Sequence, residues 1–240
     1  MIIAARDGLF GGRTYTAKDY NQNGLVAVFD GIENAGYGIH DPNAVNWANL
    51  ANRDYDAIGS GLGQWDDKCW TNESDGTAFH IGSIVAQTMD TRIFTVEMVA
   101  YTTRTDQEFA ILANYDGYNG IVFDVNYSNR ATWTRYFNAY NTWAASGMFP
   151  KGVPVYCAWT IDHVASQIVC YRNGNLYTRS SSNKTYSLGN RDTALGGDFN
   201  GNRPTLAFKG GIHAVRIYSR FLSANEIRKN YNVDRQRFHL

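Results

Sequence analysis

Hydrophobic and polar residues alternate in short runs along most of the chain, and this pattern predicts β-strands. The longest run covers residues 92–102, and its apolar face carries Phe94, Val96, Met98 and Ala100. Strands of this length, separated by turns, are typical of a sandwich of two antiparallel sheets. We expect further strands at 25–29, 68–72, 76–82, 108–115, 120–127, 131–137, 153–162, 166–174, 175–180 and 212–218.

Asn173-Gly174 is the strongest turn signal, because both central positions of a tight hairpin require positive φ. The pattern is less regular elsewhere. Residues 44–52 suggest a short helix, whereas 58–65 and 138–152 are predicted to be loops. The glycines of 59–63 are similar to half of a phosphate-binding loop. The strand and the helix that flank such a loop are not predicted here, so we expect an ordinary loop.

The stretch GGIHAVRIYSRFLSANEIRKNY, at 210–231, predicts a last strand followed by a short helix at 224–232. Ser223 and Glu226 have the spacing of a capping box, and Leu222 and Ile227 that of a hydrophobic staple. We therefore expect the helix to begin at this point and to cover an open end of the sandwich. Glu226 is assigned to the cap and not to catalysis.

The composition sets limits on the partners of this protein. The 240 residues include 22 Lys and Arg and 22 Asp and Glu, so the net charge is zero. A neutral chain lacks the basic surface of nucleic-acid-binding proteins and of membrane-surface proteins, and no window is apolar enough to span a membrane. We expect no nucleic-acid and no membrane partner. Aromatic residues make up 14%, which suits strands and also surfaces that stack on sugars.

The first residues, MIIAARDGLFGG, do not have the pattern of a signal peptide. Three alternatives stay open: a cytoplasmic protein, one released by lysis or another route, or a trimmed chain. The three cysteines do not form an even disulfide framework. One bridge between Cys157 and Cys170 is an alternative, but we expect buried free thiols.

The chain resembles the laminin-G-like, concanavalin A-like lectin family. LVAVFDGIENAG, FTVEMVAYT, CAWTIDHVASQIVCYRNGNL and FKGGIHAVRIYSRFLSANEIRKNY carry this resemblance over residues 20–232, and the last of these is the most specific. The resemblance implies an all-β jelly-roll sandwich of twelve to fourteen strands in two antiparallel sheets, with a short C-terminal helix. It further implies recognition of glycans or proteins, often with bound calcium. We expect residues 1–20 to form an arm and 21–240 one domain.

The arm and the loop DGIENAGYGIHD also resemble laminin-G-like proteins of bacteriophages. This second resemblance implies an alternative function, that of a structural or assembly protein of a phage head or tail. Such a protein would form oligomers in the virion. An arm ordered against another chain would favour assembly, and an arm packed on its own sandwich would favour glycan binding.

A glycoside hydrolase is the third hypothesis, because the fold family includes glucanases. These enzymes need two nearby carboxylates as nucleophile and general acid. Their Glu-x-Asp-x-x-Glu pattern is absent from the sequence, and the five glutamates are scattered. We therefore expect a binding protein without enzyme activity.

Two groups of residues are candidates for binding. Asp198, Asn200 and Asn202 place oxygen donors at alternate positions, as in calcium loops, although Arg203 and Lys209 replace the glycine and glutamate of an EF-hand. A self-bonded turn is the alternative. Loop residues form the second group, a predicted rim that contacts a glycan or protein. Its members are Asp116, Tyr118, Asn119, Tyr140 and Trp143.

Overall fold

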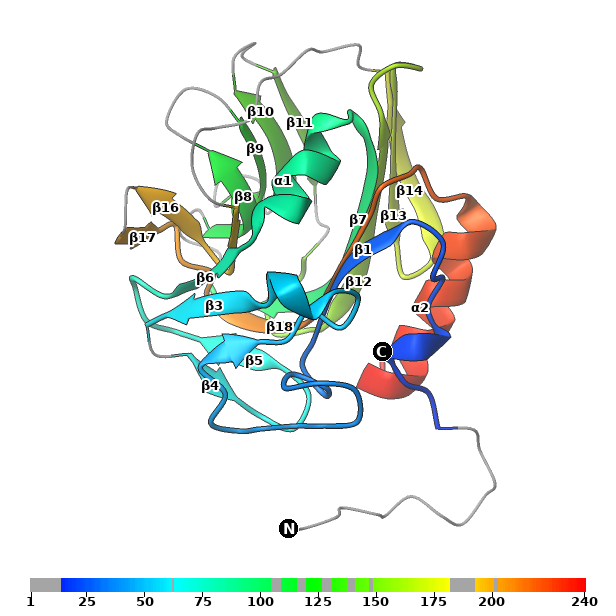
Figure 1. The fold of residues 1–240 in the computed structure, drawn as a ribbon. Coiled ribbons are helices and arrows are strands. Elements are labelled where there is room, and N and C mark those ends of the chain that lie inside the picture. Colours follow the sequence, from blue (N-terminus) through cyan, green and yellow to red (C-terminus); the bar gives the residue numbers. More distant parts are fainter. Residues whose placement is uncertain are drawn as a thin grey trace.

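The computed structural model describes residues 14–61, 63–104, 109–115, 120–126, 131–137, 141–146, 149–181, 193–200 and 203–240. Only the backbone is described at 115, 120, 124–126, 131–137, 141–146, 199–200 and 203–205. Two antiparallel sheets pack face to face, and helices lie at one end and on one outer face (Figure 1). This confirms the predicted all-β sandwich.

The first sheet has eight strands in the order β14-β13-β12-β7-β18-β5-β4, with β1 also paired to β18. Its central strands are the long ones that alternation predicted. The strands are β1 (Leu25–Asp30), β4 (Gln64–Trp65), β5 (Trp70–Asn72), β7 (Ile93–Thr102), β12 (Val155–Asp162), β13 (Gln167–Arg172), β14 (Asn175–Ser180) and β18 (Gly210–Tyr218).

The second sheet also has eight strands, in the order β11-β10-β9-β8-β15-β6-β3-β2. Its strands are β2 (Asn46–Trp47), β3 (Ala57–Ser60), β6 (Ala78–Ile81), β8 (Phe109–Tyr115), β9 (Gly120–Asn126), β10 (Ala131–Phe137), β11 (Asn141–Ser146) and β15 (Thr193–Leu195). A separate hairpin joins β16 (Asp198–Asn200) to β17 (Arg203–Thr205). The described residues thus form eighteen strands, more than the twelve to fourteen that the resemblance implied. The strands of two to four residues among them are too short for alternation to reveal.

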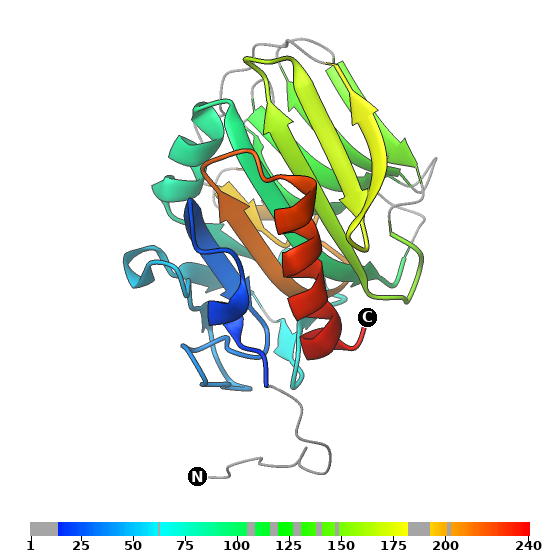
Figure 2. The ribbon, with the colours of Figure 1, turned by 90° about the vertical axis from the view of Figure 1, so that its right-hand side faces the viewer.

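The helical elements are η1 (Ala17–Asp19), η2 (Arg53–Tyr55), α1 (Ser83–Asp90) and α2 (Ala224–Phe238). Val85 and Met89 of α1 enter the core between the sheets. Helix α2 runs along the outer face of the first sheet (Figure 2). Among the described residues, neither α-helix combines the length and the apolar character needed to cross a membrane.

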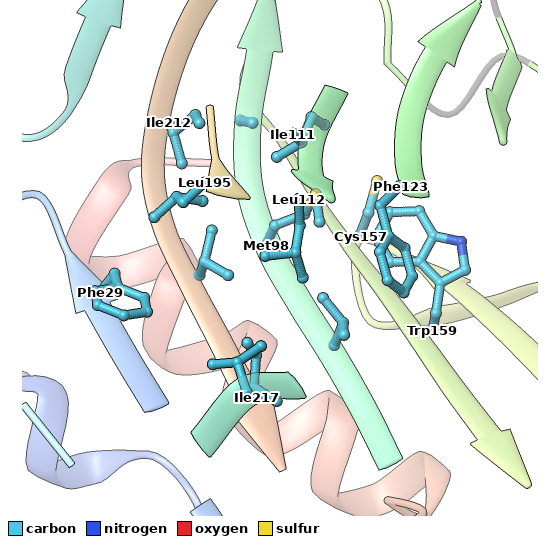
Figure 3. Packing of buried hydrophobic residues seen from close by; sticks show 14 of the residues in the cluster. Phe29, Met98, Ile111, Leu112, Phe123, Cys157, Trp159, Leu195, Ile212 and Ile217 are labelled. Atoms are coloured by element: carbon cyan, nitrogen blue, oxygen red, sulfur yellow. The ribbon is translucent and has the colours of Figure 1, made fainter. Parts of the chain in front are cut away.

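The core lies between the two sheets, and Figure 3 shows part of its packing. The predicted apolar face of β7 is confirmed, since its four residues at 94, 96, 98 and 100 are fully buried there. The opposite face of the first sheet packs against α2 through Tyr156, Tyr218 and Phe238. Because both of its faces are covered, all nine residues of β18 are buried, including Arg216.

Several local predictions are confirmed. Asn173 and Gly174 have φ angles of +48° and +72° and form the hairpin turn between β13 and β14. The three cysteines are buried and free. Burial raises the pKa of the Cys157 thiol, which keeps it protonated and unreactive.

The predictions for the least regular stretches are wrong. Residues 44–52 form no helix, because Asn46–Trp47 pairs with β3 as an edge strand. The predicted loop at 58–65 contains residues of β3 and β4, and the predicted loop at 138–152 contains β11. Helix α1 was not predicted. Its eight residues lie between two strands and are too few to establish a helical period.

The segment before β1 packs on the domain of its own chain. Ala17 and Tyr20 are each 1% exposed, and the backbone N–H of Ala17 donates to Glu33 Oε2 at 2.8 Å. Asn21 donates from its backbone to the side chain of Asn230 in α2. Residues 14–20 are therefore held between β1 and the C-terminal helix, and residues 1–13 lie outside the description.

The predicted start of α2 is confirmed. Ser223 accepts a hydrogen bond from Glu226 N, and the Glu226 carboxylate accepts one from Ser223 N. Leu222 and Ile227 are buried together as the expected staple. The predicted end at 232 and the position over an open end of the sandwich are wrong. The helix continues to Phe238 on the outer face of the first sheet, because its polar residues beyond 229 find buried partners there.

We expect the Glu226→Gln variant to be less stable than the parent protein near neutral pH, by about 0.3–1 kcal/mol, because glutamine can keep the capping-box hydrogen bond but loses the charge that faces Arg220 and the helix N-terminus. Hydrogen bonds from Arg220 and Ser223 outweigh partial burial and lower the pKa of Glu226 from 4.5 to about 2. This contribution to stability is therefore present above about pH 4.5 and is lost as the pH falls towards 2. Urea unfolding, followed by tryptophan fluorescence, should show the difference shrinking over that interval.

Glu73→Gln is the control, because Glu73 is an exposed carboxylate that accepts a hydrogen bond from the Thr103 hydroxyl. An equal loss of stability in both variants, or a difference for Glu226→Gln that does not depend on pH, would contradict the capping role.

Candidate functional site

Five aromatic side chains bring the edges of the two sheets together. Trp65 and Trp70 come from β4 and β5 of the first sheet, and Trp47 and Phe79 from β2 and β6 of the second. Trp47 contacts Trp65 edge to face, with ring centroids 4.8 Å apart, and Phe79 at 5.6 Å. Phe29 completes the cluster. Edge-to-face contacts add to the gain from burial, so this cluster fixes the geometry where the sandwich opens.

Trp65 is the member of this cluster that reaches the surface, since the other four are at most 4% exposed. A pocket of about 250 Å³ lies beside it, which we name the Trp65 pocket. Its lining residues are Pro42, Asn43, Ala44, Val45, Gly59, Ser60, Gly61, Gly63, Trp65, Trp70, Thr77, Ala78 and Phe79.

The glycines of 59–63 have a structural reason in this pocket. A Cβ atom at Gly63 would lie 1.8 Å from Trp70 Nε1, and one at Gly59 would lie 2.1 Å from the Val45 carbonyl oxygen. Gly61 has a φ of +104°, a conformation that other residues rarely adopt. The glycines therefore let the backbone approach the aromatic cluster closely and leave the pocket open.

Polar groups complete the pocket. The indole N–H of Trp65 donates to the Ala44 carbonyl oxygen at 2.8 Å, which fixes the orientation of the ring. The hydroxyl groups of Ser60 and Thr77 make no hydrogen bond to other described residues, and both can donate and accept. A fixed aromatic side chain beside hydroxyl and amide groups can bind a molecule with apolar C–H faces and several hydroxyl groups.

A second hollow, more open and of about 830 Å³, lies between residues 15–22 and α2. It is lined by Tyr15, Lys18, Asp19, Tyr20, Gln22, Asn225, Arg228, Lys229, Asn232 and Val233. This hollow carries charged side chains of both signs, whereas the lining of the Trp65 pocket carries none.

A group of charged side chains lies beneath α2 and is closed to solvent. Arg216 of β18 is fully buried, and its Nε donates to Glu97 Oε2 at 2.7 Å while Nη1 donates to Asp234 Oδ1 at 3.0 Å. Glu97 also accepts hydrogen bonds from Tyr156 and Asn230. Burial opposes the charge of Arg216, but Asp234 and Glu97 outweigh it and raise its pKa. Arg216 therefore stays charged.

A second ion-paired arginine lies beside this group. Arg237, near the end of α2, donates to Asp30 and Glu33 in and after β1. Tyr20 joins the two parts, because its hydroxyl donates to Asp234 at 2.6 Å and accepts from Arg237 at 2.8 Å. The four carboxylates are at most 4% exposed, so no sugar can reach them. We call these residues the buried ionic cluster, and their arrangement holds α2 and residues 14–20 on the sheet.

The predicted rim falls on residues whose side chains are not described. Asp116, Tyr118, Asn119 and Tyr140 lie outside the described residues, and Trp143 is described only by its backbone in β11. The adjoining strand ends are neighbours, because Gly120 pairs with Tyr115 on one side and with Phe137 on the other. The two connections thus leave the same end of the second sheet. The rim itself stays a prediction.

The predicted calcium ligands are only partly described. Asp198 is 5% exposed and belongs to β16, whose backbone pairs with β17. The side chain of Asn200 and all of Asn202 lie outside the description. No group of three or more His, Cys, Asp or Glu side chains that could hold a metal ion occurs among the described residues. The calcium site stays a prediction.

Neither the Trp65 pocket nor the buried ionic cluster was predicted from the sequence. The spacing of Gly59, Gly61 and Gly63 before Trp65 was the available signal for the pocket, because repeated glycines next to a large aromatic residue indicate close backbone approach. The members of the ionic cluster are far apart in the sequence, so no local pattern could identify them.

Comparisons with known proteins agree with this fold. The family model of the concanavalin A-like lectin/glucanases superfamily (laminin G type) matches residues 74–228. No curated protein sequence matches the chain.

Solved structures of sialidases and of a sialidase-associated module are similar to the chain. The CBM40 of Ruminococcus gnavus IT-sialidase bound to α2,3-sialyllactose has a TM-score of 0.56 and 16% identity, covering 72% of this chain and 97% of that one. Trypanosoma rangeli sialidase with 2,3-difluorosialic acid has a TM-score of 0.66 and 15% identity, covering 98% of this chain and 36% of that one. The leech intramolecular trans-sialidase has a TM-score of 0.54 and 13% identity, covering 71% of this chain and 27% of that one. At these identities the likeness concerns the fold.

Proposed function

Because the chain belongs to the concanavalin A-like lectin/glucanases superfamily, we propose that it is a glycan-binding protein without catalytic activity. The observation that carries this proposal is the Trp65 pocket, in which an oriented indole lies beside the hydroxyl groups of Ser60 and Thr77. Sugars offer apolar C–H faces to an aromatic ring and hydroxyl groups to polar side chains. The CBM40 similar to this chain has sialyllactose bound, which supports a carbohydrate as the type of ligand.

The position of the carboxylates supports binding over hydrolysis. A glycosidase places two carboxylates on either side of the sugar bond that it cleaves. The carboxylates of the buried ionic cluster are ion-paired and closed to solvent, and the described lining of the Trp65 pocket contains no charged residue. The described residues thus offer no general acid to a sugar in this pocket.

The packing of residues 14–20 favours glycan binding over phage assembly. We expected an arm that packs on its own sandwich in a glycan-binding protein, and Tyr20 is buried against α2 of the same chain. None of the similar structures named above is a phage protein.

A glycan array tests the proposal. We expect the full chain to bind a restricted set of glycans, and to leave them intact when each is incubated with the protein and analysed by mass spectrometry. Repeating the array with calcium and with a chelator tests the proposed ligands Asp198, Asn200 and Asn202, because a calcium site there would change binding or melting temperature. If the protein binds no glycan on the array under either condition, glycan binding is refuted. If it cleaves a bound glycan, the absence of catalysis is refuted.

A further inference from the structure

We propose that the Trp65 pocket selects an uncharged sugar unit and rejects a carboxylated one. This inference rests on the proposed function and names the ligand class of the same site. Among the described residues, the lining contains Asn, Ser, Thr and aromatic side chains but no Lys, Arg or His. A carboxylate that enters the pocket would lose water and gain no cation, and such a charge is costly to bury.

The size of the pocket limits the ligand to a single unit. Pockets that hold drug-sized molecules have volumes of roughly 300–1,000 Å³, and the Trp65 pocket has about 250 Å³. Val45, one of the lining residues, is an apolar side chain that is 77% exposed. It suits the C–H face of one pyranose ring and offers nothing to a charge.

The test uses sugars that differ only at carbon 6. Methyl glucoside, methyl glucuronide and the uncharged methyl glucuronamide are titrated into the full chain by calorimetry, together with the same three galacto compounds. We expect at least one neutral glycoside to bind, its carboxylate to bind at least about tenfold more weakly, and its amide to recover most of the affinity, because the amide restores neutrality without changing the shape.

A substitution at the rim should reverse the selection. Val45→Lys places a cation at the pocket and leaves the core intact, because the side chain of Val45 is already exposed. We expect this variant to bind the carboxylated sugar at least about as tightly as the neutral one. Val164→Lys is the matched control, since Val164 is 76% exposed and does not line the pocket, and it should keep the selectivity of the parent chain.

The outcomes separate this inference from the proposed function. Glycan binding that depends on Trp65 but is equal or stronger for the carboxylated sugars would overturn the selectivity and leave the function standing. Glycan binding that Trp65→Ala does not change would overturn the pocket as the site. A failure of every neutral glycoside to bind, when oligosaccharides do bind, would overturn the single-unit assignment. If no glycan on the array is bound, the proposed function itself is refuted.

Discussion

The Arg216→Met variant is expected to lose about 3–5 kcal/mol of unfolding free energy, the usual cost of removing one partner from a buried ion pair. Methionine fills much of the same volume, so the loss comes from the charges left behind. Glu97 and Asp234 would remain buried without their common cation. Urea unfolding monitored by tryptophan fluorescence and by circular dichroism measures the change.

Arg228→Met is the control for this prediction. Arg228 is exposed on α2 and forms no ion pair among the described residues, so its replacement should change the free energy of unfolding by at most about 0.5 kcal/mol. If Arg216→Met does not fold, the triple variant Arg216→Met, Glu97→Gln and Asp234→Asn gives the second measurement. It removes the unpaired charges and should recover part of the stability. A single variant as stable as the parent chain would contradict the role of the cluster.

The Trp65→Ala variant should weaken binding of the best glycan from the array by about 30-fold or more, the size of effect seen when a binding hot spot is truncated. The indole supplies the apolar surface of the pocket and is oriented by its bond to Ala44. Calorimetry with the parent chain and the variant measures the change, and unfolding curves establish that both are folded.

Two further variants make this test specific. Thr77→Val removes a hydroxyl group from the pocket and keeps the shape of the side chain, so it should weaken binding by about tenfold, as for one lost hydrogen bond. Tyr177→Ala removes an aromatic side chain that is 40% exposed on β14, outside the pocket, and should not change binding. Equal losses in Trp65→Ala and Tyr177→Ala would show a general effect of exposed aromatic residues and contradict the site.

The elements that the sequence predicted well are those with strong local signals. The alternation in β7 is long enough to identify the buried face, and the Asn173-Gly174 turn follows from backbone sterics. The capping box located the start of α2 for the same reason, because all its groups lie within four residues. The two-residue strands carry too few positions for such a pattern.

The end of α2 shows why the remaining elements were harder to predict. Asn230, Asp234 and Arg237 are polar and would normally face water, so the sequence gives no reason to continue an apolar helix face through them. In the folded chain, these side chains meet Glu97, Arg216 and Asp30, which come from β7, β18 and β1. The helix therefore extends along the sheet instead of ending after two turns.

Local sequence alone determined that this protein is a sandwich of antiparallel strands, because alternation, turn residues and helix caps act between neighbours in the chain. Only the tertiary structure revealed the pocket that we propose as the ligand site. The Trp65 pocket needs Val45, Gly63 and Thr77 from three separate segments, and the ionic cluster needs charges from both ends of the chain. Such sites depend on which residues the sheet edges bring together, and that pairing is set by packing across the whole fold.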